Sequence, residues 1–268
     1  MSPFPRLSLL LPCALATLGV ACDRNEPNST APPVRILFLH HSTGEDIWDG
    51  GVAKFFKTYN RSHGTNLQIT ERWYPDQPMG NYAYDYWNLW VNPAGPANAT
   101  SPGLHNLETL AANSDVIVFK HCFPASAIRP DTDCDPPNIA SSVKTLANYR
   151  LQYEALKARM RQFPTTKFIL WTGAVLTEAS TNPGNAQRAK EFSEWVKGTW
   201  DEKGDNIYLW DFYALETEGT LYMKDAYAYK KNDSHPASAF ARTAAPLLGQ
   251  RIVDVSEGRG DAGSLTGK

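Results

Sequence analysis

The sequence has almost no excess of charge of either sign. Its 268 residues include 26 Lys and Arg against 28 Asp and Glu, a formal net charge of −2. Binding to nucleic acid through phosphate contacts requires a basic surface, so this balance gives no reason to expect such a partner. Cysteine is scarce too, with four in the chain, which excludes a disulfide-rich scaffold.

Long apolar runs are missing after the N-terminal region, where no later segment approaches the roughly 20 apolar residues of a spanning helix. The N-terminal region itself has Arg6, a mostly apolar stretch over 7–21, and then Cys22. This pattern predicts an export signal over residues 1–22. The string "LGVAC" resembles the bacterial lipobox, in which the cysteine is acylated, although an ordinary signal peptide with an incidental cysteine is the alternative.

The lipobox interpretation makes Cys22 the lipidated residue and residues 23–33 a flexible tether, since their composition is typical of disorder. It places the chain in the bacterial periplasm or at the cell surface, held to the membrane by an N-terminal lipid anchor only. In that oxidising compartment Cys122 and Cys134 are expected to form a disulfide, with two unpaired thiols as the alternative.

The remaining chain alternates short apolar runs with longer amphipathic segments and contains no internal repeat. The apolar runs predict parallel strands buried on both faces, at 35–40, 67–73, 115–120, 167–172 and 206–211. The segments between them predict helices, at 46–59, 104–112, 141–163, 185–200 and 236–253.

This alternation predicts one α/β domain over residues 34–254, with three layers (α/β/α) around a five-stranded parallel sheet. The polar, Gly-rich residues 255–268 are expected to be a disordered tail. In such sheets, sites lie beyond the carboxyl ends of the strands. With a flavodoxin-like strand order, the first and third strands are neighbours, so Ser42 and His121 would share a crevice.

Ser42 follows the first strand in "FLHHSTG", directly before a helix, and this position suits a nucleophile on a sharp turn. The same residues would also make an ordinary helix cap. Near the C-terminus, "NDSHP" places His235 immediately before Pro236 and the last predicted helix. A histidine there is well placed to act as a base.

These two motifs resemble those of the SGNH (GDSL-like) hydrolase superfamily, and the resemblance extends over about 34–253 in the order of elements. The segments "DVIVFKHCFPAS" and "YDYWNLW" look like features of an exported, lipid-anchored branch. The resemblance implies a flavodoxin-like fold and a serine esterase that needs no metal or cofactor. Ser42 would attack an ester carbonyl, His235 would move the proton, and an acidic residue would orient the imidazole.

The sequence departs from the family pattern at the residues that assist this pair. The family's aspartate stands three residues before the histidine, where this chain has Asn232, while Asp233 stands two residues before it. Asp233, Asn232 or a backbone carbonyl could therefore orient His235. The family's oxyanion donors are the nucleophile's own N–H, which is that of Ser42 here, a glycine after the second strand, for which Gly80 is the candidate, and an asparagine after the third strand. That asparagine is missing, and His121 or Lys120 could replace it.

A metal site is an alternative role for the histidines, since six plausible ligands are expected near one end of the sheet: His40, His41, His121, Asp211, Asp233 and His235. Adjacent strand residues point to opposite faces, so His40 and His41 are not expected to reach one ion. The aromatic segment "NYAYDYWNLWVNP" is expected to be a loop, whose rings either cover the core or face a sugar.

Two functions from different classes follow from this sequence. The first is a serine esterase that removes short acyl groups, such as acetyl, from carbohydrate or other cell-envelope esters, or that transfers the acyl group to a sugar. The second is a noncatalytic glycan-binding lipoprotein on a degenerate form of the same fold. The changed orienting acid favours the second, and the retained Ser42 and His235 favour the first.

Overall fold

A five-stranded parallel sheet forms the centre of the protein in the computed structural model, which describes residues 32–75, 79–96 and 105–268. The strand order is β2-β1-β3-β4-β5, the flavodoxin-like order, and every pairing in this sheet is parallel. The predicted α/β/α architecture is therefore confirmed, and β1 and β3 are neighbours as expected. The predicted signal, Cys22 and most of the tether lie outside the described residues.

The strands lie where the apolar runs predicted them, with boundaries that differ by one residue at most. They are β1 (Val34–His40), β2 (Leu67–Trp73), β3 (Val116–Lys120), β4 (Lys167–Trp171) and β5 (Ile207–Trp210). All five residues of β3 are buried, as expected for a central strand covered on both faces.

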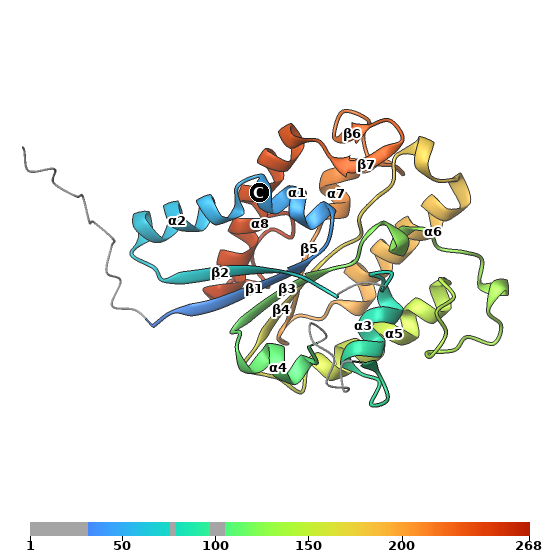
Figure 1. Cartoon of the computed structure of the whole chain (residues 1–268), viewed down its shortest axis with the longest axis horizontal. Coiled ribbons are helices and arrows are strands. Elements are labelled where there is room, and N and C mark those ends of the chain that lie inside the picture. The colour runs from blue at the N-terminus through green and yellow to red at the C-terminus, as the bar shows by residue number, and fades with distance from the viewer. Residues whose placement is uncertain (1–31, 76–78, 97–104) are drawn as a thin grey trace, which may run out of the picture.

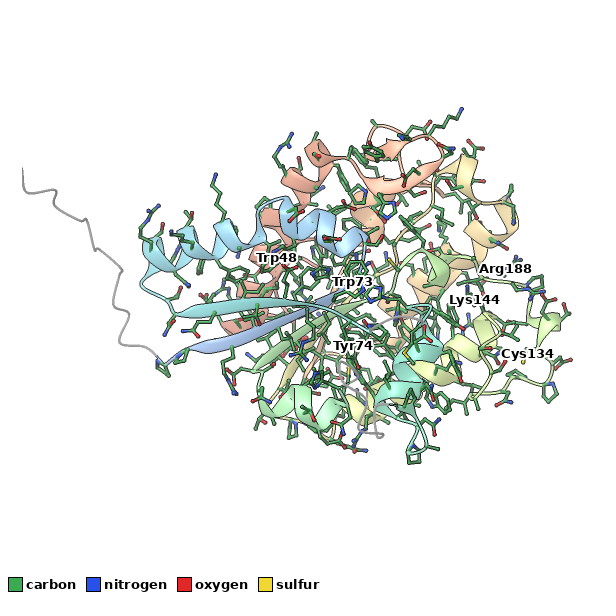
Figure 2. All side chains as sticks on the ribbon, in the orientation of Figure 1. Trp48, Trp73, Tyr74, Cys134, Lys144 and Arg188 are labelled. Atoms are coloured by element: carbon green, nitrogen blue, oxygen red, sulfur yellow. The ribbon has the colours of Figure 1, made fainter. Side chains whose placement is uncertain are left out.

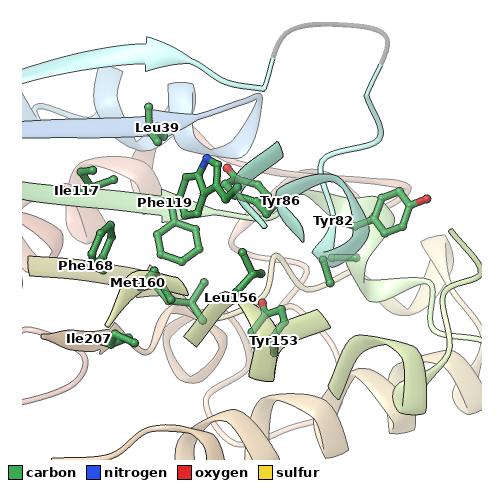
Figure 3. Packing of buried hydrophobic residues seen from close by; sticks show 14 of the residues in the cluster. Leu39, Tyr82, Tyr86, Ile117, Phe119, Tyr153, Leu156, Met160, Phe168 and Ile207 are labelled. Atoms are coloured by element: carbon green, nitrogen blue, oxygen red, sulfur yellow. The ribbon is translucent and has the colours of Figure 1, made fainter. Parts of the chain in front are cut away.

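The two faces of the sheet carry separate apolar layers, because side chains alternate along each strand. Along β3, Val116 and Val118 belong to one layer and Ile117 and Phe119 to the other. On the first face lie helices α1 (Thr43–Asp49), α2 (Val52–His63) and α8 (Ser238–Ser256) (Figure 1). On the second lie α3 (Ala83–Trp90), α4 (Leu107–Ala112) and α5 (Leu146–Met160) (Figure 1). Figure 3 shows the second layer, in which Phe119 packs near residues of α5 such as Leu156.

The helices differ more from the predictions than the strands do. The helices around the sheet are α1 (Thr43–Asp49), α2 (Val52–His63), α3 (Ala83–Trp90), α4 (Leu107–Ala112), α5 (Leu146–Met160), α6 (Pro183–Trp195), α7 (Phe212–Thr217) and α8 (Ser238–Ser256). The single helix predicted over 46–59 is divided in two, because Gly51 has a φ of 120°. A π-helical turn, Val196–Trp200, follows α6.

The aromatic segment predicted to be a loop is instead helix α3. Its start is capped by Asp85, whose carboxylate accepts a hydrogen bond from the Tyr82 N–H at 3.2 Å. Tyr86, Trp87 and Trp90 are buried, and Tyr86 and Trp90 pack edge to face with their centroids 5.0 Å apart. The aromatic rings of this segment are therefore mainly core.

A short antiparallel hairpin before α8 was not predicted. It consists of β6 (Ala228–Lys230) and β7 (Asp233–Pro236), and its second strand contains the "DSHP" residues. The last helix consequently begins at Ser238, two residues later than predicted.

The expectation of a disordered C-terminal tail was wrong. Helix α8 continues to Ser256, and the residues after it pack beside β5. The Asp211 N–H donates to the Leu265 carbonyl at 2.8 Å, and the Trp210 indole donates to the Thr266 carbonyl at 3.1 Å. These acceptors are backbone groups, so the polar composition of the segment did not reveal them. No helix within the described part of the chain is both long enough and apolar enough to span a membrane.

Candidate active site

Ser42 occupies a strained turn between β1 and α1. Its φ of 42° and ψ of −103° lie outside the regions that side-chain-bearing residues normally adopt. The chain then turns sharply, with the Gly44 N–H donating to the His41 carbonyl at 2.7 Å. Gly44 is required here, because a Cβ at this position would overlap the Cβ of His40 and lie 3.0 Å from the Lys120 Cδ. The turn leaves the Ser42 side chain partly exposed.

Strand β7 determines the directions in which the side chains of His235 and its neighbours point. Residues two apart in an extended strand share a face, so Asp233 and His235 point to the same side and Ser234 to the other. Ser234 is buried, and its hydroxyl accepts a hydrogen bond from the Thr177 N–H at 2.9 Å. This hydrogen bond holds β7 in place on the face opposite to Asp233 and His235.

A continuous hydrogen-bonded chain joins three of the four candidate catalytic side chains. The Ser42 hydroxyl contacts His235 Nε2, and His235 Nδ1 contacts Asp233 Oδ1 at 2.6 Å. A carboxylate only accepts hydrogen bonds, so Nδ1 carries the proton and Nε2 of the neutral ring accepts from the Ser42 hydroxyl. The hydrogen bonds from His235 also hold the pKa of Asp233 below its usual value, which keeps that carboxylate ionised.

Asp233 therefore makes the contact with the imidazole that is expected of the orienting residue. The sequence had left both Asp233 and Asn232 as candidates for this contact. The carboxylate also accepts the backbone N–H of His235 at 3.2 Å. Within the described parts of the chain, no hydrogen bond joins the Asn232 side chain to His235. On the other side, the ring of Phe123 packs edge to face against the imidazole, with centroids 4.9 Å apart.

Gly80 and His121, the predicted oxyanion donors, are not directed at Ser42 by any contact between described residues. The backbone N–H groups of Gly80, Asn81 and Tyr82 surround the Asp85 carboxylate and oppose the rise in its pKa that burial causes. His121 has the opposite orientation to Lys120, as expected for adjacent residues at a strand end. Its ring packs edge to face on Tyr86 at 4.8 Å.

His121 is buried, and both of its ring nitrogens lack a hydrogen-bond partner among the described residues. Burial, assisted by the charge of Lys120, lowers the pKa of His121 to about 3, so the ring is neutral. It lines a small cavity of about 30 Å³ together with Tyr153 and Ser193. This volume is enough for one or two water molecules.

Asn81 is a residue near the site that sequence reasoning missed. It has a φ of 56°, is buried, and its amide oxygen and nitrogen both lack a partner within the described ranges. Its backbone carbonyl accepts the Cys122 N–H at 2.9 Å. The available signal was the Gly80-Asn81 pair, since asparagine tolerates positive φ better than most residues.

The predicted disulfide between Cys122 and Cys134 is absent, and both cysteines are free thiols. Cys122 is buried beside the Ser42 turn, with its Sγ 3.3 Å from Lys120 Nζ. Burial alone would raise the pKa of this thiol, but the charge of Lys120 and the hydrogen bonds to the thiol together outweigh it, and the pKa is lowered. Cys134 lies at the edge of the molecule, where its Sγ is 3.5 Å from the Ser141 hydroxyl (Figure 2). The turn that follows β3 carries the chain away from Cys122, so the two thiols do not meet.

His40 and His41 have separate partners, in agreement with their expected opposite orientations. His40 Nε2 lies 2.6 Å from Glu71 Oε2, and His41 Nε2 contacts the Pro75 carbonyl. His41 also stacks on Trp73 with a centroid distance of 4.4 Å. Among the described residues, no three His, Cys, Asp or Glu side chains are grouped to hold a metal ion.

Comparison of the chain with protein-family models gave no match, and no curated protein matched it. Two solved structures have similar coordinates. An acetyl xylan esterase is 13% identical, with a TM-score of 0.48, over 79% of this chain and 96% of the esterase. A gut microbial diltiazem-metabolizing enzyme is 11% identical, with a TM-score of 0.46, over 88% of this chain and 49% of that enzyme.

Proposed function

We propose that this protein is a serine esterase of the SGNH type. The observation that carries the proposal is the hydrogen-bonded series from the Ser42 hydroxyl through His235 to the Asp233 carboxylate. Three side chains from opposite ends of the sequence form this series, in the order in which a nucleophile, a base and an orienting acid act. A structural cap for α1 would not need either His235 or Asp233.

The reaction follows from these positions. The Ser42 Oγ attacks the ester carbonyl carbon while His235 Nε2 accepts the hydroxyl proton, and Asp233 stabilises the imidazolium that forms. When the tetrahedral intermediate collapses, the bond to the alkoxy oxygen breaks and Nε2 returns the proton to the leaving alcohol. Water then attacks the acyl group on Ser42 by the same route, which releases the acid and restores the serine.

The proposed substrates are short acyl esters, such as acetyl esters, of carbohydrate or another cell-envelope component. The expected export signal and acylated Cys22 support an envelope substrate, because they would hold the domain at the bacterial membrane surface. The same Ser42 ester could also pass its acyl group to a sugar hydroxyl in place of water.

Hydrolysis of p-nitrophenyl acetate by the domain from Val34 onward tests the proposal. We expect turnover that is lost in Ser42→Ala and His235→Ala, together with covalent labelling of Ser42 by a fluorophosphonate. Ser234→Ala is not a suitable control because Ser234 anchors β7, whereas the exposed Ser62 on α2 offers Ser62→Ala. Absence of both turnover and labelling in the unsubstituted protein would reject the esterase and favour a glycan-binding protein.

A further inference from the structure

Lys120, the last residue of β3, is completely buried under the turn that presents Ser42. An ammonium group has three N–H donors, and here it has three acceptors. These are the His41 carbonyl at 3.1 Å, the Thr43 hydroxyl, and the Cys122 Sγ at 3.3 Å. Two of the three acceptors belong to the residues on either side of Ser42.

Within the described part of the chain, no carboxylate forms a direct ion pair with this buried charge, and Asp46 and Glu216 interact with it only at longer range. The ammonium instead lies over the ring of Trp171, 5.6 Å from its centroid. The buried Glu216 does not compensate for it, because burial raises the pKa of that carboxyl well above its usual value and favours the neutral acid. Burying a cation is energetically costly, so a lysine at this position indicates a role that an apolar residue could not have.

The contact with the His41 carbonyl determines the direction of the next N–H. In a trans peptide the C=O and N–H of one peptide unit point in opposite directions. The carbonyl of His41 belongs to the same unit as the N–H of Ser42. Because Lys120 and the Gly44 N–H both bind this carbonyl, the Ser42 N–H points away from them and is polarised by the ammonium charge.

We infer that Lys120 is a positioning residue that aims and strengthens the Ser42 N–H as a donor to the oxyanion. The inference rests on the proposed esterase function, since it concerns the transition state of that reaction. It also accounts for the strained conformation of Ser42, which the bonds to His41 and Thr43 hold from both sides. Lys120 does not itself touch the substrate.

The test compares Lys120→Met, which removes the ammonium group and keeps an unbranched side chain one atom shorter, with the unsubstituted domain. We expect the rate of fluorophosphonate labelling and kcat to fall by about tenfold to a hundredfold, with KM changed by less than about threefold. The affinity for phenylboronic acid, which forms a negatively charged tetrahedral adduct with the serine, should fall by a similar factor. A loss of general packing would not weaken this anionic adduct selectively.

Two further variants separate this role from a structural one. Lys157 on α5 is another buried lysine, bonded to the Trp200 carbonyl at 2.8 Å and to Glu202 at 2.7 Å. Lys157→Met is therefore the matched control, and kcat and the labelling rate should stay within about twofold of the unsubstituted values. Thr43→Val removes the hydroxyl that binds Lys120 and should lower the labelling rate, whereas Thr43→Ser should retain it.

Proton NMR of His40 reports whether the charge has been removed without loss of the fold. Burial and the charge of Lys120 hold the pKa of His40 at about 4, so Lys120→Met should raise it. Unchanged labelling together with a raised His40 pKa would overturn the inference. If Lys120→Met does not fold, unchanged labelling in Thr43→Val would overturn it instead. Failure of the unsubstituted domain to react would reject the esterase proposal, and the inference with it.

Discussion

At the scale of single residues, the conformation of the backbone decides which acidic side chain can reach His235, the proposed base. An Asp-x-His pair fits this site because β7 is extended, which places Asp233 and His235 on one face. Asn232, at the family's spacing, precedes the strand. The sequence could not distinguish Asp233 from Asn232 as the orienting residue, because it gave no sign that "DSHP" is extended.

Asp233→Asn tests this assignment. The amide cannot stabilise an imidazolium by charge, and its NH₂ group can impose the wrong tautomer on His235. We expect kcat for p-nitrophenyl acetate to fall by about a hundredfold or more, with little change in stability because both side chains are partly exposed. Steady-state kinetics and a thermal melt measure the two effects.

Asp225→Asn is the control for this variant, since Asp225 is an exposed aspartate outside the hydrogen-bonded series. Its kinetics should match those of the unsubstituted domain. Asn232→Ala should be far less damaging than Asp233→Asn. The reverse order would identify Asn232 as the residue that orients His235.

Lys120 shows why the rest of the site could not be predicted from the sequence. A lysine at the end of a strand usually has its charged end in solvent, and nothing in "VIVFKHC" indicates that Lys120 turns inward beneath Ser42. The contact between Ser42 and His235 could be expected because each residue lies in a recognisable local motif. The contacts of Lys120, His121 and Asn81 depend on long-range packing.

At the scale of elements, the strands were predictable and the connections were not. Central parallel strands are continuous apolar runs such as "VIVF", and burial on both faces leaves few other interpretations. The segment that forms α3 contains many aromatic residues, which have a modest helix propensity, so its helical pattern was not recognised. The hairpin of β6 and β7 was missed because it is short and largely polar.

Gly44, in the first turn of α1, lies against β1 with no room for a side chain. A methyl group there would overlap the Cβ of His40, which belongs to β1 and has little freedom to move. Gly44→Ala should therefore destabilise the domain by about 1 to 3 kcal/mol and displace Ser42, so that fluorophosphonate labelling slows. Urea unfolding and labelling kinetics measure both effects.

Gly198 provides the matched control. It lies in the π-helical turn after α6, and a Cβ there would meet no heavy atom within 4 Å. Gly198→Ala should leave labelling unchanged and stability equal or slightly higher, because alanine restricts the unfolded chain. Equal stability of Gly44→Ala and Gly198→Ala would show that β1 can accommodate the methyl group.

At the scale of the whole molecule, the C-terminal residues complete the layer around β5. Arg251, on α8, is buried and donates to the Leu209 and Gly260 carbonyls, both at 2.6 Å. This arginine thereby links α8, β5 and the final segment. Ending the chain at Gly258 would expose its guanidinium and leave the Trp210 indole without its acceptor.

We expect this truncation to lower the free energy of unfolding by about 3 kcal/mol or more, since each buried donor without a partner costs about 1 to 3 kcal/mol. Equilibrium urea unfolding measures the loss. Ala262→Ser, an exposed substitution in the same segment, should have no effect because the relevant acceptors are backbone carbonyls. Equal stability of the truncated and complete domains would mean that the segment is a disordered tail, as its composition predicts.

Buried His121 makes the stability of the whole domain depend on pH. Its pKa is about 3 in the folded protein against 6.5 for the ordinary side chain, so below pH 6.5 the unfolded chain binds a proton that the folded protein excludes. The contribution of this residue to stability is therefore fully present above pH 6.5 and is lost as the pH falls toward 3, at up to about 1.4 kcal/mol per pH unit.

His121→Phe removes the titrating group and keeps a ring for Tyr86 and Tyr153 to contact. Urea unfolding between pH 4 and 8 should show that this variant loses less stability in acid than the unsubstituted domain, by up to about 1.4 kcal/mol per unit below pH 6.5. His63→Gln, at an exposed position on α2, should follow the unsubstituted domain. Parallel stability curves for all three proteins would contradict this prediction. They would mean that water in the cavity beside His121 solvates the charged ring, so that the folded protein can bind the proton without losing stability.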